Sequence, residues 1–345
     1  MRIVLTRLSS LGDIVHTWPL ADALRLLPER LELAWVVEEP FRPLVERHPA
    51  VGRTVPVATQ RWRRHPLARE TWRQIREARR ALVEFSADVA LDPQGLYKSA
   101  GWARIAGAPL RIGLGRSLRR EPLAGLLYSR TVTPPPAVRH VVDFNLALLE
   151  SLGASPPWGA LPDGRFLLVG AAPPPEVERG TVALLPATGG RGKAWSPGCF
   201  AGLARELAKG GVPVVVVWGP GEAELARAIA QEAGGGVRLA PRTGIVELAA
   251  LLAACRAVVG GDTGPIHLAA SLGVPTVAIF LASDAERNGP RGRAVTVVQG
   301  AETGGPRSHA RRRQRRAVSV SEVLDALWTV AGPGAQASAP ALAAS

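Results

Sequence analysis

Short apolar runs alternate with amphipathic segments along this chain, and the alternation occurs twice. In the first half, strands are predicted at residues 3–5, 33–37, 53–57 and 89–91, and helices at 13–27, 42–48, 67–85 and 140–152. The second half restarts with strands at 182–185, 212–218 and 237–239, and helices at 198–209, 222–232 and 245–255. Strands buried on both faces are continuously apolar, and helices connect parallel strands. The pattern therefore predicts an α/β protein with two Rossmann-like, doubly wound domains that face a central cleft.

The length of 345 residues also favours two domains. Proline and glycine are concentrated between the two series, so we expect an N-terminal domain at 1–158, a linker at 159–179 and a C-terminal domain at 180–318. Ser319 and Glu322 have the spacing of a capping box, which predicts a final helix over 319–331. The Ala/Pro/Ser/Gly composition of 332–345 predicts a disordered tail.

The composition is that of an ordinary soluble protein, with 47% hydrophobic residues and a formal charge of +13. No apolar run approaches the roughly 20 residues of a membrane-spanning helix. The start at Met1-Arg2 leads directly into a strand, so no signal peptide is expected. Cys199 and Cys255 lie alone in apolar contexts, which fits a reducing cytoplasm and no metal cluster. The charge suggests an anionic partner, which could be nucleic acid, a membrane surface or a phosphorylated substrate.

Residues 259–273 form a Gly-rich turn between two apolar stretches, and the turn leads into a short helix. Thr263 or Gly264 can cap that helix, and Pro265 sits where its missing N–H has no cost. Glycines allow a ligand to approach the backbone closely, while the helix start presents free N–H groups and a partial positive charge. This pattern indicates a site for a phosphate or diphosphate.

A second turn joins the first predicted strand to the first predicted helix and contains Ser9, Ser10, Gly12 and Asp13. It falls at the carboxyl edge of a parallel sheet, where open α/β folds place their ligands. Asp13 has two interpretations, which the turn alone leaves open. It can be a helix N-terminal acid that interacts with the helix dipole, or a carboxylate able to take a proton from a substrate hydroxyl.

Together with several other segments, these turns resemble family 9 glycosyltransferases, the bacterial lipopolysaccharide heptosyltransferases, and most closely heptosyltransferase I-like members. In the first half the resemblance includes the segments 9–13 (SSLGD), 35–39 (WVVEE), 61–64 (RWRR), 92–100 (DPQGLYKSA) and 120–124 (REPLA). In the second half it includes 193–195 (KAW), Trp218-Gly219 with Glu222, and Asp262-Thr263-Gly264 with His267. The shared order and spacing extend over nearly the whole chain.

The resemblance implies a GT-B fold and an inverting reaction that needs neither a metal nor another cofactor. It implies transfer of a heptose from ADP-heptose to a Kdo residue of Kdo-lipid A, with Asp13 as the base. The implied residues of the ADP-sugar site, in the second domain, are Thr188, Lys193, Glu222, Asp262, Thr263, Gly264 and His267. The implied residues of the acceptor site, in the first domain, are Ser10, Arg61, Arg63, Arg64, Lys98 and Arg120.

Several of these assignments have a structural alternative that the sequence leaves open. Lys193 can be a surface lysine in a Gly-rich loop, Glu222 a helix N-terminal acid and His267 a structural histidine. The arginines at 61–64 can form a solvated loop, although guanidinium groups also bind phosphates and carboxylates bidentately.

The basic run at 311–316 could bind nucleic acid, but no aromatic stacking platform accompanies it. Anionic lipid headgroups are the better partner, which predicts a cytoplasmic protein attached to the inner face of the cytoplasmic membrane. Among other functions, another family 9 activity such as heptosyltransferase II remains open. An NAD-type oxidoreductase is disfavoured because the first turn lacks Gly-x-Gly-x-x-Gly spacing. A non-catalytic basic nucleotide- or membrane-binding protein would leave the Asp13 turn unexplained.

Overall fold

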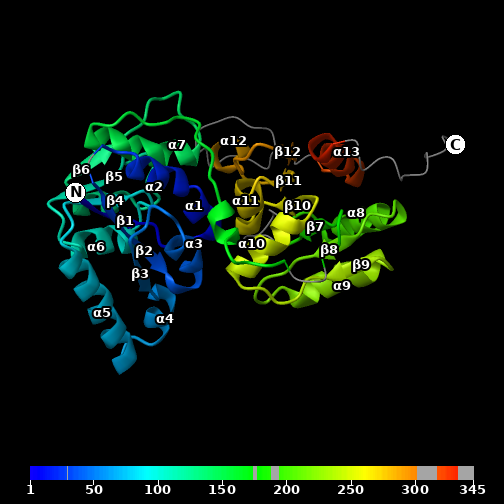
Figure 1. The fold of residues 1–345 in the computed structure, drawn as a ribbon, viewed down its shortest axis with the longest axis horizontal. Coiled ribbons are helices and arrows are strands. Elements are labelled where there is room, and N and C mark those ends of the chain that lie inside the picture. Colours follow the sequence, from blue (N-terminus) through cyan, green and yellow to red (C-terminus); the bar gives the residue numbers. More distant parts are fainter. Residues whose placement is uncertain (29, 174–176, 188–193, 301–316, 333–345) are drawn as a thin grey trace. The chain divides into compact units, whose positions relative to one another are not determined.

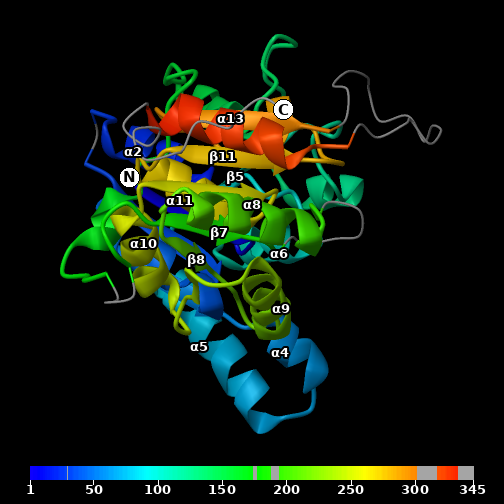
Figure 2. The ribbon, with the colours of Figure 1, turned by 90° about the vertical axis from the view of Figure 1, so that its right-hand side faces the viewer.

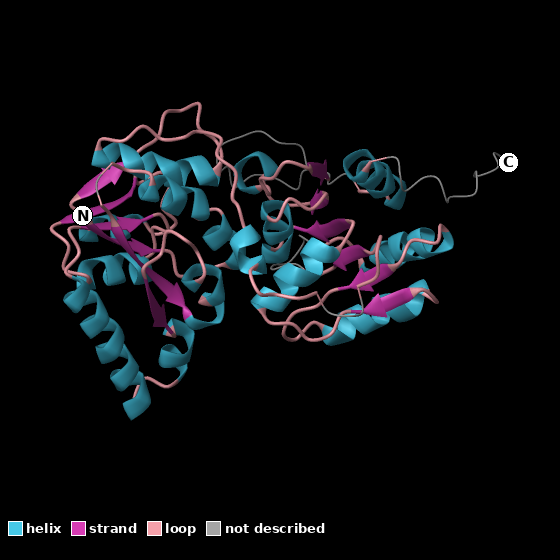
Figure 3. Cartoon of the chain, in the orientation of Figure 1, coloured by secondary structure: helices cyan, strands magenta, loops and turns pink. Residues whose placement is uncertain are grey.

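The computed structural model describes residues 1–28, 30–173, 177–187, 194–300 and 317–332. The chain divides into two compact units, Met1–Pro162 and Asp163–Ser345. Each unit contains a six-stranded parallel sheet with helices on both faces (Figures 1 and 3). The prediction of two doubly wound α/β domains is therefore confirmed.

The first sheet has the order β3-β2-β1-β4-β5-β6. Its strands are β1 (Arg2–Thr6), β2 (Glu32–Glu38), β3 (Arg53–Val57), β4 (Val89–Asp92), β5 (Leu110–Leu114) and β6 (Arg130–Val132). The helices of this unit are α1 (Leu11–Val15), α2 (Trp18–Arg25), α3 (Pro43–Glu46), α4 (Thr59–Arg64), α5 (Arg69–Phe85), α6 (Tyr97–Ile105) and α7 (Val141–Leu146). Three 3-10 helices complete it: η1 (Glu39–Phe41), η2 (Pro122–Leu127) and η3 (Ala147–Leu152).

The second sheet has the order β12-β11-β10-β7-β8-β9. Its strands are β7 (Val182–Leu185), β8 (Val214–Val216), β9 (Val237–Leu239), β10 (Ala257–Gly261), β11 (Thr276–Phe280) and β12 (Val295–Gln299). The helices are η4 (Arg165–Leu168), α8 (Pro197–Lys209), α9 (Ala223–Ala233), α10 (Ile245–Ala254), α11 (Gly264–Ser271), α12 (Ala285–Asn288) and α13 (Val320–Ala331). η4 packs against α10, so residues 165–168 belong to this unit although the sequence suggests a linker there.

Both sheets are wound in the same way. Each begins at a central strand, adds two strands on one side and then returns to add three on the other. The direction changes between β1 and β4 in the first unit and between β7 and β10 in the second. Turns that leave the carboxyl ends of these central strands are where doubly wound folds bind ligands. The turns containing Asp13 and Asp262 occupy these two positions.

Apolar side chains of the strands pack against helices on each face of the sheets. In the first unit, α4, α5 and α6 cover one face, where Trp62 and Trp102 have ring centroids 6.0 Å apart. In the second unit, α8, α9 and α13 cover one face (Figure 2), and Phe200 and Leu327 are fully buried there. No helix in the described ranges is long and apolar enough to cross a membrane.

The predicted helix at 13–27 is wrong in one respect, because two helices stand in its place. α1 ends at Val15 and α2 begins at Trp18. Pro19, in the first turn of α2, has no N–H to donate to the carbonyl of Val15, and its ring would clash with that carbonyl in a continuous helix. The break leaves α1 as a short helix that carries Asp13.

The capping box predicted at Ser319 is confirmed. The Ser319 N–H donates to Oε2 of Glu322 at 2.8 Å, and the Glu322 N–H donates to the Ser319 hydroxyl at 3.3 Å. The basic run 311–316 and the tail from residue 333 onward lie outside the described residues.

Candidate functional site

The carboxylate of Asp13 is held at the first strand switch point by the residue that begins its helix. Ser10 is the N-cap of α1, and both its backbone N–H (3.0 Å) and its hydroxyl (2.9 Å) donate to Oδ2 of Asp13. The Asp13 side chain is 42% exposed, so its other oxygen can be reached from solvent. The arrangement orients a carboxylate while leaving it accessible, as a general base requires.

A buried guanidinium, that of Arg7, lies near this carboxylate. Nη1 of Arg7 is 3.9 Å from Oδ1 of Asp13, while its other nitrogens donate to Oγ1 of Thr17 and Oδ1 of Asn145, both at 3.2 Å. Burial lowers the pKa of Arg7, and the charges of Asp13 and Asp92 oppose that shift. Because a guanidinium remains protonated in proteins, Arg7 is a fixed positive charge beside Asp13.

The turn after β4 is organised by Asp92, which is fully buried. Its Oδ1 accepts the N–H groups of Gln94 (2.8 Å) and Gly95 (3.1 Å), and its Oδ2 accepts the hydroxyls of Ser99 (2.8 Å) and Tyr128 (2.7 Å). Burial raises the pKa of the Asp92 carboxyl, and these hydrogen bonds oppose that effect. Asp92 thus shapes the loop that leads into α6.

This loop is joined to the Asp13 turn by two side chains. Gln94 accepts from the Leu8 N–H at 2.9 Å and donates to the Ser9 carbonyl at 3.3 Å. Lys98, on α6, donates to the Ser9 hydroxyl at 3.3 Å and lies 3.6 Å from Oε1 of Glu38. The structure therefore brings the predicted residues Ser10 and Lys98 to the turn that carries Asp13.

The arginine cluster at residues 61–64 belongs to helix α4 rather than to a loop. Nη1 of Arg61 is 2.8 Å from Oε2 of Glu39, and Nη2 donates to Gln74 at 3.0 Å. Trp62 is buried, whereas Arg63 and Arg64 are exposed. The hydroxyl and N–H of Thr59, the first residue of α4, both donate to the carboxylate of Glu38. Glu38 therefore connects α4 to Lys98.

Arg120 is exposed and lies beside the start of α6, because the carboxylate of the adjacent Glu121 accepts the Tyr97 N–H at 2.5 Å. The neighbouring Arg119 is buried instead. Its guanidinium donates to the carbonyls of Leu114 (2.8 Å) and Pro122 (3.1 Å). Arg119 therefore fixes the backbone of this segment, while Arg120 is free to contact solvent.

In the second unit, the turn after β10 has the predicted form. Thr263 is the N-cap of α11, and Pro265 lies in its first turn. Thr263 and Gly264 are half-buried, and the first N–H groups of a helix have no partner within it. A Cβ on Gly260 would stand 2.7 Å from the Cβ of Leu185, so β10 and β7 approach closely at the switch point. The turn thus offers N–H groups that can donate hydrogen bonds to an anionic group.

Asp262 and His267 flank this turn. Oδ2 of Asp262 accepts the Ser283 hydroxyl at 2.6 Å, and Nε2 of His267 lies 4.0 Å from Oδ1. The Asp262 side chain is 14% exposed and that of His267 is 6% exposed. Of the two side chains, that of Asp262 is therefore the more accessible to a ligand.

Glu222 precedes α9, and its Oε2 accepts the Gly219 N–H at 2.7 Å. This contact closes the turn that follows β8. Thr188 and Lys193 lie outside the described residues.

The sequence did not single out four residues that hold the candidate site together: Arg7, Glu38, Gln94 and Ser283. Arg7 carried a usable signal, since a charged residue directly after an apolar strand is costly to bury and implies a partner. Glu38 lies in the segment 35–39 of the resemblance, but neither Glu38 nor Ser283 was assigned a role, because their partners Lys98 and Asp262 lie far from them in the sequence.

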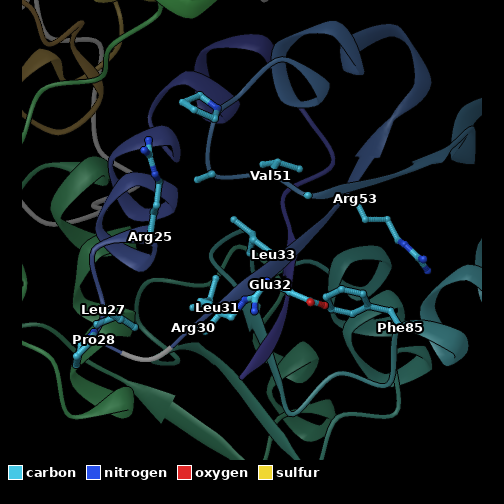
Figure 4. A pocket seen from close by; sticks show the side chains of 13 residues that line it. Arg25, Leu27, Pro28, Arg30, Leu31, Glu32, Leu33, Val51, Arg53 and Phe85 are labelled. Atoms are coloured by element: carbon cyan, nitrogen blue, oxygen red, sulfur yellow. The ribbon is translucent and has the colours of Figure 1, made fainter.

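A cavity of about 800 Å³ lies elsewhere on the first unit, at the amino ends of β2 and β3 (Figure 4). Arg25, Arg53, Leu33 and Phe85 are among the residues that line it. Asp13 follows the carboxyl end of β1, and β2 runs parallel to β1. The cavity is therefore at the opposite edge of the sheet from Asp13.

The chain is similar to proteins of known family. Residues 75–317 match the model of glycosyltransferase family 9 (heptosyltransferase). The chain is 35% identical over 302 residues to lipopolysaccharide heptosyltransferase 1 of Pseudomonas aeruginosa, covering 85% of this chain and 82% of the relative. It is 32% identical over 305 residues to that of Escherichia coli K12, covering 87% and 93%.

Solved structures agree with these sequence matches. The E. coli heptosyltransferase WaaC with ADP superposes with a TM-score of 0.77 at 31% identity, covering 87% of this chain and 94% of that one. The E. coli ADP-heptose LPS heptosyltransferase II shares the fold, with a TM-score of 0.73 at 21% identity, covering 96% and 98%. The GT-B fold class is thereby confirmed, and the chain belongs to glycosyltransferase family 9, the heptosyltransferase family.

Proposed function

We propose that this chain transfers L-glycero-D-manno-heptose from its ADP derivative to a Kdo residue of Kdo-lipid A, in assembly of the lipopolysaccharide inner core. The reaction inverts the anomeric centre and uses no metal. The observation that carries this proposal is the accessible carboxylate of Asp13, oriented by Ser10 at the first switch point of a family 9 chain. Similar proteins that bind ADP and an ADP-heptose analogue support the choice of donor.

Asp13 acts as the general base. Its free carboxylate oxygen takes the proton of the acceptor hydroxyl while the hydroxyl oxygen attacks the anomeric carbon of the heptose. The bond between that carbon and the diphosphate oxygen breaks on the opposite side, so the configuration is inverted and ADP leaves. Nη1 of Arg7, 3.9 Å from Oδ1 of Asp13, places a fixed positive charge beside this carboxylate.

The second unit binds the donor. The N–H groups at Thr263 and Gly264 and the positive end of α11 stabilise the charge that develops on the leaving diphosphate. Asp262 and Glu222 bind hydroxyl groups of the ADP-sugar, and His267 supports Asp262. The sequence assigns Thr188 and Lys193 to the same site, with Lys193 as a point charge near the diphosphate.

The first unit binds the acceptor. Lys98, Arg61, Arg63, Arg64 and Arg120 supply cations for the carboxylates of Kdo and the phosphates of lipid A. The exposed arginines Arg63, Arg64 and Arg120 can form bidentate contacts without breaking an existing ion pair in the described part of the chain.

We place the protein in the cytoplasm, attached peripherally to the anionic inner face of the cytoplasmic membrane, where a lipid-linked acceptor is available. The arginine run at 311–316 would contribute to this attachment. Heptosyltransferase II activity is the second candidate. It is less well supported, because identity to lipopolysaccharide heptosyltransferase 2 of Salmonella typhimurium is 26% over 319 residues.

The test is turnover of ADP-heptose with Kdo-lipid A by wild type, Asp13→Asn and Asp13→Ala. A general base contributes about 10²- to 10⁴-fold, so both variants should lose at least about 10²-fold in kcat while still binding ADP. Asp325→Asn, on the exposed face of α13, is the matched control and should retain full activity. Product NMR should show the inverted anomer, and EDTA should leave the rate unchanged. Undiminished turnover by Asp13→Asn would remove Asp13 as the base.

A further inference from the structure

Helices α4 and α5 form a hairpin that projects from the first unit beside the edge strand β3 (Figures 1 and 2). The C-terminal half of α5 is anchored in the core through Ala78, Leu82 and Phe85. At the other end of the hairpin, Leu67 is 92% exposed and Trp72 is 54% exposed. Exposing a large aliphatic and a large aromatic side chain within five residues of each other is costly in water, so this end is suited to contact another surface.

The outer face of α5 combines apolar and cationic side chains. Trp72, Arg76, Arg79 and Val83 follow the spacing i, i+4, i+7 and i+11, which places them on one face of a helix. All four are exposed, and Val83 is 53% exposed. Arg69, one turn before Trp72 and Arg73, extends the same face to the beginning of the helix.

The positive charge of this face is not neutralised. Arg73 pairs with both Glu70 and Glu77, so the negative charges of these two carboxylates are balanced by Arg73. Arg69, Arg76 and Arg79 form no ion pair within the described ranges of the chain. Residues 61–80 hold eight arginines and two glutamates, a net +6 of the +13 carried by the whole chain. The hairpin therefore concentrates nearly half of the net charge in twenty residues.

We infer that this membrane-contact face, made of Leu67, Arg69, Trp72, Arg76, Arg79 and Val83, docks on an anionic phospholipid bilayer. Leu67 and Trp72 enter the headgroup region, where tryptophan rings are favoured, and the arginines bind lipid phosphates. The inference deepens the proposed function, since it names the surface that would bring the enzyme to a lipid-linked acceptor. None of these six residues belongs to the proposed catalytic or sugar-binding set.

A bilayer fits this face better than a nucleic acid does. A stacking surface for bases needs successive aromatic side chains along a groove, and Trp72 is the one aromatic residue of this face. Leu67, which is 92% exposed, gains free energy in an apolar medium but not against a phosphate backbone. The arginines are spread along more than two turns of α5, as expected for contact with a planar anionic surface.

The full-length protein is sedimented with vesicles of phosphatidylcholine alone or with about one-third phosphatidylglycerol, in the absence of substrates. Wild type should bind the anionic vesicles, and added salt should weaken binding. Arg76→Gln/Arg79→Gln should bind roughly 30-fold more weakly, from two near-surface cations. Leu67→Ser and Trp72→Ser should each bind about tenfold more weakly. Because Leu67 is almost fully exposed, its variant should fold normally.

Matched controls are Arg104→Gln on α6 and Leu26→Ser after α2, both exposed and outside this face. They should bind vesicles as wild type does. Wild-type binding by the Leu67, Trp72 and double-arginine variants would overturn the inference. The inference would also be overturned if vesicle binding were lost only when residues 311–316 are changed to glutamine. The same holds if wild type does not bind the anionic vesicles.

Transfer to a deacylated, water-soluble acceptor separates this inference from the proposed function. The face variants should retain wild-type kcat/KM on that acceptor and lose activity only on vesicle-embedded acceptor. If wild type binds vesicles through this face but transfers no heptose, the proposed function fails and the membrane contact stands.

Discussion

The ammonium group of Lys98 lies 3.6 Å from Oε1 of Glu38, a carboxylate that is almost completely buried. Through Thr59, the same carboxylate holds the first residue of α4, and through Lys98 it reaches the hydroxyl of Ser9. The buried carboxylate of Glu38 therefore connects helix α4 to the turn that contains Asp13. Lys98 has two separable roles, one in this pairing and one in the proposed binding of the acceptor.

Replacing Lys98 by methionine should remove the cation that compensates Glu38. The Thr59 donors remain, so we expect a loss of about 1–3 kcal/mol in the free energy of unfolding, measured in urea. Lys98→Met/Glu38→Gln should recover part of this loss because the buried charge is gone. Activity should not recover in the double variant. If it did, Lys98 would act only by pairing with Glu38.

Replacing Ser283 by alanine should remove one hydrogen bond that orients the Asp262 carboxylate, whose Oδ2 accepts the Ser283 hydroxyl at 2.6 Å. If Asp262 contacts the donor, its loss of orientation should weaken ADP binding several-fold and raise KM for the ADP-sugar more than it changes kcat. Calorimetric titration with ADP measures the first effect. Ser321→Ala, at the exposed start of α13, is the control and should leave ADP affinity unchanged. Unaltered ADP binding by Ser283→Ala would count against Asp262 as a donor contact.

Much of the fold could be predicted because its signals are local. The continuous apolar character of β1, β2 and β8 identified them as strands, and the Ser319 capping box identified the start of α13. Strand β6 was missed. It has three residues, two of them exposed, and depends on pairing with β5 for its existence.

The same distinction applies to the candidate site. The turns of Asp13 and Thr263 were visible because each combines a strand end, a cap and glycine within a few residues. The contact between Lys98 and Glu38 depends on β2 and α6 meeting at one sheet edge, which no spacing in the sequence encodes. Helix α4 was missed because five of its six residues are polar or charged and only Trp62 is buried.

The stability of the first unit should depend on the charge of Asp92. Burial raises the pKa of this carboxyl above its usual 3.8, so the folded state binds the proton more tightly than the unfolded state does. Stability attributable to Asp92 should therefore fall as pH rises from about 4 through the raised pKa, and stay constant above it.

The isosteric variant Asp92→Asn should lack this slope. Its oxygen can still accept from Gln94 and Gly95, and its NH₂ group can donate to the hydroxyls of Ser99 and Tyr128. Urea midpoints of both proteins are measured from pH 4 to pH 8. The midpoint of the variant should rise relative to that of wild type as pH rises. A difference that does not change with pH would mean that the hydrogen bonds fully offset the burial of Asp92.

Two glycine-to-alanine changes should have opposite signs. An alanine Cβ at Gly260 would meet the Cβ of Leu185 at 2.7 Å and its carbonyl oxygen at 3.2 Å, so β10 and β7 must separate at the switch point. We expect a loss of about 1–3 kcal/mol and weaker ADP binding, because the adjacent turn carries the N–H donors. Gly101 lies inside α6 with no atom within 4 Å of an added Cβ, so Gly101→Ala should stabilise by about 0.5–1 kcal/mol. Thermal unfolding and ADP titration of both variants measure these effects. Normal ADP affinity in a destabilised Gly260→Ala protein would separate the packing of the sheet from the donor site.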